Sequence, residues 1–445
     1  MHKIFNLSQV LSEFFNKTAE DISLETGFIK RKRKLTGSSF IKAMILGNLG
    51  NGNCSIDGLC QFLHEDCIEI TKQGVDFRFT KTAVSFMEQM FYKSLALFKK
   101  ELPLEVCLLR HFESVKLLDS TYLTLPSCME ATYKGYGSSY PIHKTPTKSG
   151  LKLQLVFDYL NQVLDRFELR EGKRCDQSYK DHLTNIVPNE LFIADLGYFS
   201  PDSFKQIHQS KAYFISRYKA DTNIYDRDTH QKRNLLEDLA HQECLEMEVL
   251  LGKQVKQPVR IIATKLSHEH SMARKRKANK LAKSHGYTSS ARNQKLLDWS
   301  IVITNLPADK FTSDQISLLY KVRWQIELLF KLYKSHIQIE ALKGKLKPSR
   351  ILCELYAKLC IILLFHGIVS CVKLEKNTEI SLTKAMLEFK NRARELFLAL
   401  KGSSPILQRF LKKLTLAWSK FSLKDRYRKT RISTLKSLAL SMINP

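Results

Sequence analysis

Residues 115–125 read Val-Lys-Leu-Leu-Asp-Ser-Thr-Tyr-Leu-Thr-Leu, with apolar side chains at every second position and an aspartate, Asp119, among them. Alternate residues of a strand point to one face, so Asp119 shares its face with four apolar residues, Val115, Leu117, Leu123 and Leu125. A carboxylate on an apolar face is costly unless it is paired or bound to a metal. This stretch therefore predicts a buried strand that carries a structural or functional carboxylate.

The sequence after this strand alternates between strand-like and helix-like patterns. Further strands are expected over residues 151–159, 163–170, 191–195, 212–217 and 299–304. Helices are expected over 178–186 and from Pro201, which Ser200 caps. This order predicts an α/β fold, a mixed sheet layered with helices.

The two ends of the chain and one internal segment do not follow this alternating pattern of strands and helices. Residues 1–105 have helical apolar spacing, and two short helices near 55–64 and 72–79 fit a helix-turn-helix or an ordinary helical hairpin equally well. Residues 220–298 contain two strand-like runs and a basic stretch, so we expect an inserted subdomain that faces DNA. Residues 373–445 are basic with helical apolar spacing, which predicts a folded helical region.

The net charge is the strongest signal in the composition. Seventy-one Lys and Arg against 44 Asp and Glu leave +27, which indicates a polyanionic partner, most commonly nucleic acid, with an anionic lipid surface as the alternative. No segment has the pattern of a signal peptide or a membrane span, and the longest apolar stretch, 359–372, is expected to be a buried helix. We therefore expect a cytoplasmic protein without a membrane partner.

Ten cysteines are scattered along the chain. One cluster, Cys54, Cys60, His64 and Cys67, suggests zinc, but its spacing matches no Cys-x2-Cys pattern. Thiols in a reduced core are the simpler interpretation.

A helix expected from Thr312, with Gln315 completing a capping box, carries an unusual polar face. Five side chains share an arc of about 80° on it: Tyr320, Arg323, Glu327, Lys331 and Lys334. A solvated charged face would explain them. Cationic and phenolic groups around a single carboxylate also suit a metal-bound phosphodiester.

Asp195 ends a short buried strand just before a glycine turn, a position where active sites are built at the edge of a sheet. Asp119 or Asp195 alone would more often be a hydrogen-bonded structural aspartate than a catalytic one. Together with Glu327 they offer three hard oxygen ligands, as two-metal phosphoryl transfer requires. Among the other acidic residues, Asp158 is expected on a strand surface and Asp176 in a turn or cap.

The order Asp119, Asp195, Glu327 resembles that of the DDE transposases, which have a ribonuclease-H-like core. Residues 320–334 are similar to the Tyr-x2-Arg-x3-Glu-x6-Lys signature of the insertion-sequence-four family, with all four signature positions matched by Tyr320, Arg323, Glu327 and Lys334. The segments around both aspartates also resemble that family's blocks. One departure is Leu196, where the family usually has a basic residue.

The resemblance implies a DNA transposase that cuts element ends and transfers strands to target DNA. Asp119, Asp195 and Glu327 would hold two Mg²⁺ ions, for which Mn²⁺ can substitute. Tyr320, Arg323 and Lys334 would contact phosphates near the cleaved strand. Lys331, on the same polar face, is also expected to contact DNA. Trp299 would stack on an extruded base, although core packing explains a tryptophan at the start of a strand equally well.

The resemblance also implies the partners and the division of the chain. Double-stranded DNA and a second copy in a synaptic homodimer are the expected partners, in a bacterial, nucleoid-associated setting. The expected regions are a DNA-binding region (1–105), the first part of the catalytic core (106–219), a β-rich basic insertion (220–298), the second part of the core (299–372) and a basic helical region (373–445). A nuclease of the same fold without strand transfer and an inactive domesticated DNA-binding protein remain alternatives.

Overall fold

The computed structural model describes residues 2–31, 34–51, 54–97, 107–137, 147–284, 286–342, 347–375 and 378–424. Its strands form a single mixed sheet in the order β2-β3-β1-β5-β6-β11-β10-β9-β7-β8, and β4 pairs with β3 outside this path. The strands are β1 Ser114–Thr124, β2 Lys134–Gly137, β3 Thr147–Asp158, β4 Val163–Glu171, β5 Glu190–Ala194, β6 Tyr213–Arg217, β7 Ile224–Asp226, β8 Lys232–Arg233, β9 Cys244–Leu251, β10 Gln257–Lys265 and β11 Trp299–Thr304.

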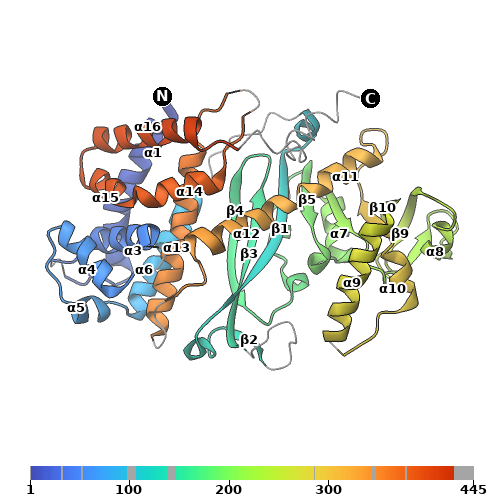
Figure 1. Ribbon diagram of the computed structural model, residues 1–445, viewed down its shortest axis with the longest axis horizontal. Coiled ribbons are helices and arrows are strands. Elements are labelled where there is room, and N and C mark those ends of the chain that lie inside the picture. Colours follow the sequence, from blue (N-terminus) through green and yellow to red (C-terminus); the bar gives the residue numbers. More distant parts are fainter. Residues whose placement is uncertain are drawn as a thin grey trace.

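Helices cover the sheet and build a separate helical body beside it (Figure 1). The α-helices are α1 His2–Glu13, α2 Ala19–Glu25, α3 Gly37–Asn51, α4 Ile56–Glu65, α5 Lys72–Asp76, α6 Lys81–Leu97, α7 Pro201–Gln209, α8 Leu235–Asp238, α9 His268–Ser284, α10 Ala291–Leu296, α11 Ser313–Lys321, α12 Trp324–Leu332, α13 Pro348–Val369, α14 Leu382–Asn391, α15 Ala393–Lys401 and α16 Ser404–Phe421. Short 3-10 or π-helical turns are η1 Phe14–Thr18, η2 Cys107–His111, η3 Ser127–Met129, η4 Asp176–Ser178, η5 Asp181–Leu183, η6 Leu196–Tyr198 and η7 Tyr333–Ile337.

The alternating apolar pattern of residues 115–125 becomes the central strand β1. It pairs antiparallel with β3 and parallel with β5. Odd-numbered side chains such as Leu117 and Leu123 are buried in a first apolar core, whereas Leu118 is buried in a second core on the other face. The predicted mixed α/β fold is confirmed, and the two-residue period explains why the strand was recognisable.

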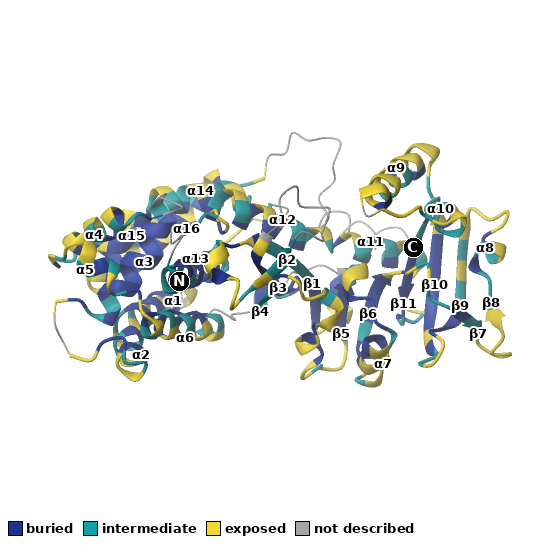
Figure 2. Cartoon of the chain, turned by 90° about the horizontal axis from the view of Figure 1, so that it is seen from below, coloured by how far each residue is buried: buried dark blue, intermediate teal, exposed yellow. Residues whose placement is uncertain are grey.

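The strands of the insertion extend this sheet and do not form a separate subdomain. The runs expected within 220–298 are β9 and β10, and β10 pairs with β11 along its length. This pairing gives hydrogen-bond partners to the backbone N–H and C=O groups that would be unpaired if β11 were an edge strand. The basic stretch is α9, most of whose residues are exposed (Figure 2).

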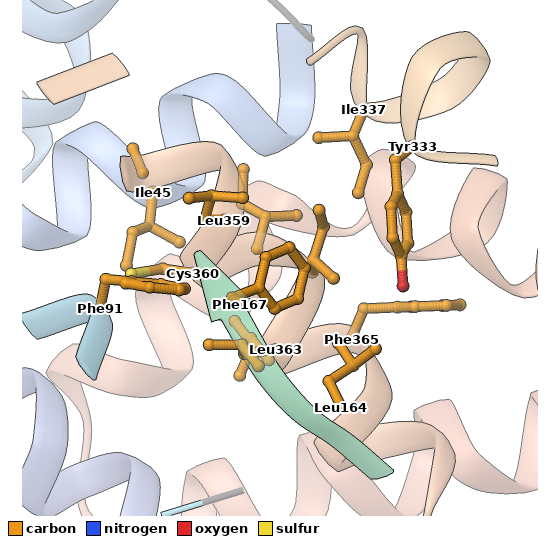
Figure 3. Packing of buried hydrophobic residues seen from close by; sticks show 14 of the residues in the cluster. Ile45, Phe91, Leu164, Phe167, Tyr333, Ile337, Leu359, Cys360, Leu363 and Phe365 are labelled. Carbon is orange, nitrogen blue, oxygen red and sulfur yellow. The ribbon is translucent and has the colours of Figure 1, made fainter. Parts of the chain in front are cut away.

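Helices from the two ends of the chain form one body, although the sequence suggested two separate regions. α1 packs on α16, and α3 packs on α13 and α15. This body shares its core with the sheet, because β4 lies against α6 and α13 (Figure 3). The rings of Phe91 on α6 and Phe167 on β4 meet edge to face with centroids 5.9 Å apart.

α13 is, among the described residues, the one helix long and apolar enough to cross a membrane, with 22 residues. In its most apolar window, 89% of the residues are buried inside the protein. The expected buried helix is therefore confirmed, and it is longer than the apolar stretch that suggested it.

One local expectation was wrong. Residues 178–186 form no α-helix and contain only η5 and the end of η4, since Tyr, His, Thr and Asn in this stretch are weak helix formers.

Of the two interpretations of residues 55–79, the ordinary helical hairpin fits better. α4 and α5 pack together, and α5 has five residues, which is too short to lie along a DNA groove.

The cysteines of the cluster lie in different environments. Cys54 is buried, Cys60 is half-buried on α4 and Cys67 is exposed. The buried Cys54 thiol packs close to Gly47 of α3.

Candidate active site

Asp119 lies in the middle of β1, where it pairs with Leu155 of β3, one residue beyond the last pair between β1 and β5. Its side chain is 17% exposed and projects from the face that carries the first apolar core. The N–H of Ser120 donates to Asp119 Oδ1 over 2.8 Å. The expected carboxylate on an apolar face is therefore present, and it is mostly buried.

Asp195 follows the parallel neighbour of β1. The register of β1 and β5 ends at Leu118 opposite Ala194, so Asp119 and Asp195 are the next residues on two adjacent strands. Asp195 Oδ1 accepts a hydrogen bond from Gly197 N at 2.8 Å and caps η6. The chain turns away at this point, which leaves the carboxylate at the edge of the sheet.

Glu327 reaches the site from α12, which crosses the sheet in front of β1 (Figure 1). Arg323 links it to the first aspartate. One guanidinium nitrogen, Nη2, lies 2.5 Å from Glu327 Oε1 and the other, Nη1, lies 3.8 Å from Asp119 Oδ2. The predicted carboxylates from β1 and α12 therefore face each other across a single arginine.

The electrostatics of this cluster are dominated by burial and like charge. Burial and the charges of Asp195 and Glu327 raise the pKa of Asp119, and the Ser120 N–H and Arg323 oppose them, so that this pKa is about 7. Burial also raises the pKa of Tyr320, which lies beside Arg323. A buried carboxylate with two acidic neighbours favours a bound cation.

The other polar residues expected on this helix lie in different environments. Tyr320 is partly buried at the end of α11, and Lys331 is exposed and lines a cavity of about 720 Å³ between α12 and the C-terminal helices. Lys334 lies in η7, where its Nζ donates to Tyr122 O at 3.1 Å and pairs with Glu340 at 2.6 Å.

The single continuous helix expected across these residues is broken. α11 ends at Lys321 and α12 begins at Trp324, with a tight turn between them, although the capping box of Thr312 and Gln315 is confirmed. The break turns Arg323 toward Asp119. The five polar groups therefore do not form the single straight stripe that helical spacing predicted.

Residues 110–364 of the chain match the family described as the transposase DDE domain. The chain belongs to this family. It is 28% identical over 424 residues to the transposase of insertion sequence element IS231B from Bacillus thuringiensis subsp. berliner, with 89% of this chain and 87% of the relative covered. It is also 28% identical over 472 residues to the transposase of IS1151 from Clostridium perfringens, with 98% and 97% covered.

Among solved structures, the chain is similar to one from the synaptic complex of the piggyBac transposase with hairpin DNA. The sequences are 13% identical, the TM-score is 0.41, and 97% of this chain and 87% of that chain are covered. The protein is thus a transposase whose curated relatives belong to bacterial insertion sequences, as the resemblance to the insertion-sequence-four family implied. Transposases with this domain act on DNA and generally need a divalent metal.

Trp299 is placed differently from what base stacking requires. Its side chain is 8% exposed and lies in the second apolar core of the transposase. Arg274 of α9 donates to its backbone carbonyl at 3.0 Å. The ring has no open face for a base, which favours the packing alternative.

The expectation for Asp158 was wrong, because the residue is buried. Its Oδ1 accepts from the backbone N–H groups of Val115 and Asn161, at 3.3 and 3.1 Å. Burial raises the pKa of this carboxyl. Asp158 therefore fastens the turn between β3 and β4 to the start of β1.

Asp176 lies in a turn, as expected, because it opens the 3-10 turn η4. It contacts residues next to both proposed catalytic aspartates, and sequence reasoning missed this network. Gln154, a polar residue within the apolar run of β3, was the available signal, since a fully buried amide needs partners.

Proposed function

We propose that this transposase cuts the ends of its element and joins them to target DNA with Asp119, Asp195 and Glu327. The observation that carries the proposal is that Asp119 and Asp195 each directly follow the last paired residue of two adjacent strands. Glu327 is linked to Asp119 through Arg323. Three carboxylates from three separate segments lie near one another, since the charges of Asp195 and Glu327 both act on Asp119.

The donor set fits hard divalent cations, and we infer Mg²⁺, with Mn²⁺ as a substitute. Carboxylate oxygens are the ligands that such ions prefer. Within the described residues, no three His, Cys, Asp or Glu side chains already converge closely enough to hold an ion. Arg323 occupies the space between Asp119 and Glu327, so its side chain and that of Glu327 would change rotamer when a cation binds.

Two bound ions would supply activation of the attacking oxygen and stabilisation of the leaving oxygen in an in-line displacement. The residues of the chain orient the DNA for this reaction. Arg323, released from Glu327, can hold a phosphate with two parallel N–H groups. Tyr320 lies beside Arg323 in the same site.

A path for DNA follows from the charge of the insertion. Arg276, Lys280 and Lys283 are exposed on one face of α9. α9 lies on the same side of the sheet as α12, opposite α7 (Figure 2). We propose that DNA runs along this side, from the carboxylates to α9.

Pairing two element ends requires two active sites, so we propose a homodimer in the synaptic complex. The charge of +27 fits a protein held on nucleoid DNA. A monomer that processes both ends of one DNA molecule would contradict the dimer.

The decisive experiment uses a donor plasmid with the inverted repeats that flank the gene, and a target plasmid. Asp119→Asn, Asp195→Asn and Glu327→Gln should each abolish Mg²⁺-dependent cleavage while anisotropy shows near-normal DNA binding. Asp165→Asn is a matched control, because Asp165 pairs with Lys116 on the same sheet and belongs to no part of the proposed site.

The products decide among the alternatives. Joined donor-target molecules support a transposase that completes strand transfer, and cleavage without joining indicates a nuclease. Binding without cleavage by the unaltered protein indicates an inactive DNA-binding protein. Cleavage by any of the three active-site variants would remove that residue from the site.

A further inference from the structure

A fourth carboxylate, Asp176, lies behind the proposed catalytic aspartates. It opens η4, after the β3–β4 hairpin, and its side chain is 24% exposed. Asp176 Oδ1 accepts from Ser120 Oγ and from Gln154 Nε2, each at 2.8 Å, and lies 3.2 Å from Lys152 Nζ. One oxygen therefore receives three donors from two strands.

The contact through Ser120 reaches the first aspartate. Ser120 directly follows Asp119 and donates its backbone N–H to Asp119 Oδ1. Ser120 pairs across the strands with Gln154, whereas Asp119 pairs with Leu155, so Ser120 and Asp119 project from opposite faces of the sheet. Asp176 consequently holds β1 from the face opposite to the Asp119 carboxylate.

A second contact reaches the other aspartate. Gln154 is fully buried and bonds Asp176 through its amide nitrogen, while its amide oxygen accepts a hydrogen bond from the Tyr198 hydroxyl. Tyr198 belongs to η6, the turn that Asp195 caps.

Gly197, in the same turn, separates the two acidic side chains. A Cβ atom there would lie 3.0 Å from Asp195 Oδ1 and 3.3 Å from Asp176 Oδ2. Asp176 thus contacts the segments that carry both aspartates.

We propose that Asp176 is a positioning residue that fixes the spacing of Asp119 and Asp195 and so sets the affinity of the site for divalent cations. The inference rests on the proposed function. Asp176 is not itself a ligand, because its Oδ1 is saturated with donors and it supports β1 from the opposite face. Partners of this kind, which orient metal ligands, typically change metal affinity or activity about 10- to 100-fold when they are removed.

The experiment measures Mn²⁺ binding by electron paramagnetic resonance on the full chain, together with the Mg²⁺ dependence of nicking. Asp176→Ala removes the shared acceptor, and we expect both half-saturating concentrations to rise about tenfold or more, with DNA binding unchanged. Asp176→Asn keeps an acceptor oxygen and should restore most of the affinity. Asp165→Ala is the control, since that carboxylate is similarly exposed and pairs with a lysine.

Ser120→Ala keeps the proposal testable if Asp176→Ala fails to fold. It removes the hydroxyl that links Asp176 to β1, and it should weaken Mn²⁺ binding in the same direction. Unchanged metal binding in Ser120→Ala, or in a folded Asp176→Ala, would overturn the proposal. Complete loss of Mn²⁺ binding in Asp176→Asn would also overturn it, because that result marks a ligand.

Different results would contradict the proposed catalytic site and the proposed positioning role of Asp176. If Asp119→Asn binds Mn²⁺ and cleaves DNA like the unaltered protein, the proposed catalytic site is wrong. If Asp119→Asn is inactive but Asp176→Ala has normal metal dependence, only the positioning role is wrong.

Discussion

Lys334 Nζ donates a hydrogen bond of 3.1 Å to the backbone carbonyl of Tyr122. This bond joins the helical turn that follows α12 to the strand of Asp119, three residues beyond that aspartate. α12 carries Glu327, so the bond helps to set the distance between the two carboxylates. The lysine of the family signature therefore has a structural role available in addition to a phosphate contact.

We expect Lys334→Met to slow cleavage about tenfold and to lower the free energy of unfolding by about 1 kcal/mol. A hydrogen bond from a charged group contributes about 1.5–3 kcal/mol, and exposure of this side chain reduces the effect. Glu340→Gln removes only the exposed ion pair and should cost less than about 1 kcal/mol. Cleavage and denaturant titrations test both, and normal stability with weakened DNA binding would indicate a phosphate contact alone.

The strands and the places of Asp119 and Asp195 were predictable because their signals are local. Alternation over residues 115–125 marks β1, and a short apolar run before a glycine marks the end of β5 just before Asp195. The break between α11 and α12 was not predictable, since no proline or glycine interrupts the helical pattern near Arg323. Packing of α12 against β1 places it there.

Contacts between segments that lie far apart in the chain were also not predictable from the sequence. Nothing in residues 244–265 indicates that β10 pairs with β11, or that α1 packs on α16 at the other end of the chain. The hydrogen-bond network of Asp176 joins residues on β1, β3 and η4, which are far apart in the chain and form no recognisable sequence motif. These arrangements depend on tertiary contacts, which a periodic pattern does not record.

The raised pKa of Asp119 predicts a pH dependence of stability in metal-free protein. In the unfolded chain this carboxyl has its ordinary pKa of 3.8, and in the folded protein its pKa is about 7. Between these values the folded state holds a proton that the unfolded chain has released, so stability falls as pH rises through this window. Asp119→Asn stays neutral and lacks this contribution.

The measurement compares the two proteins by urea unfolding at pH 5 and pH 8. The unaltered protein should lose about 2–3 kcal/mol more than Asp119→Asn between these values. The buried Asp158 contributes equally to both proteins and cancels in the difference. Parallel pH profiles would show that Asp119 is ionised throughout. The same pKa predicts that affinity for divalent cations falls as pH drops below about 7.

DNA binding should depend steeply on salt, with a log-log slope of at least about −5. Arg276, Lys280 and Lys283 lie within an arc of about 60° on α9, as a contact with one phosphate strand requires. Replacing all three with Ala should make the slope shallower by about 2 to 3, since each phosphate contact contributes about 0.9. Lys205→Ala on α7 is the control and should leave the slope unchanged. An unchanged slope in the triple variant would exclude α9 from the DNA path.

Substitution of Trp299 distinguishes the two roles considered for its ring, packing in the core and stacking on a base. Its ring is buried in the second apolar core, and its strand pairs with β10 opposite Lys265. Trp299→Ala would leave a cavity, so we expect a loss of about 3–5 kcal/mol in unfolding free energy and failure at every step of transposition. Trp299→Phe keeps much of the volume and should recover most of the loss. Thermal melting and separate assays of first-strand nicking and later steps measure these effects. The opposite result, normal melting and nicking with a later step slowed by about one to two powers of ten, would mean that the ring leaves the core and stacks on a base.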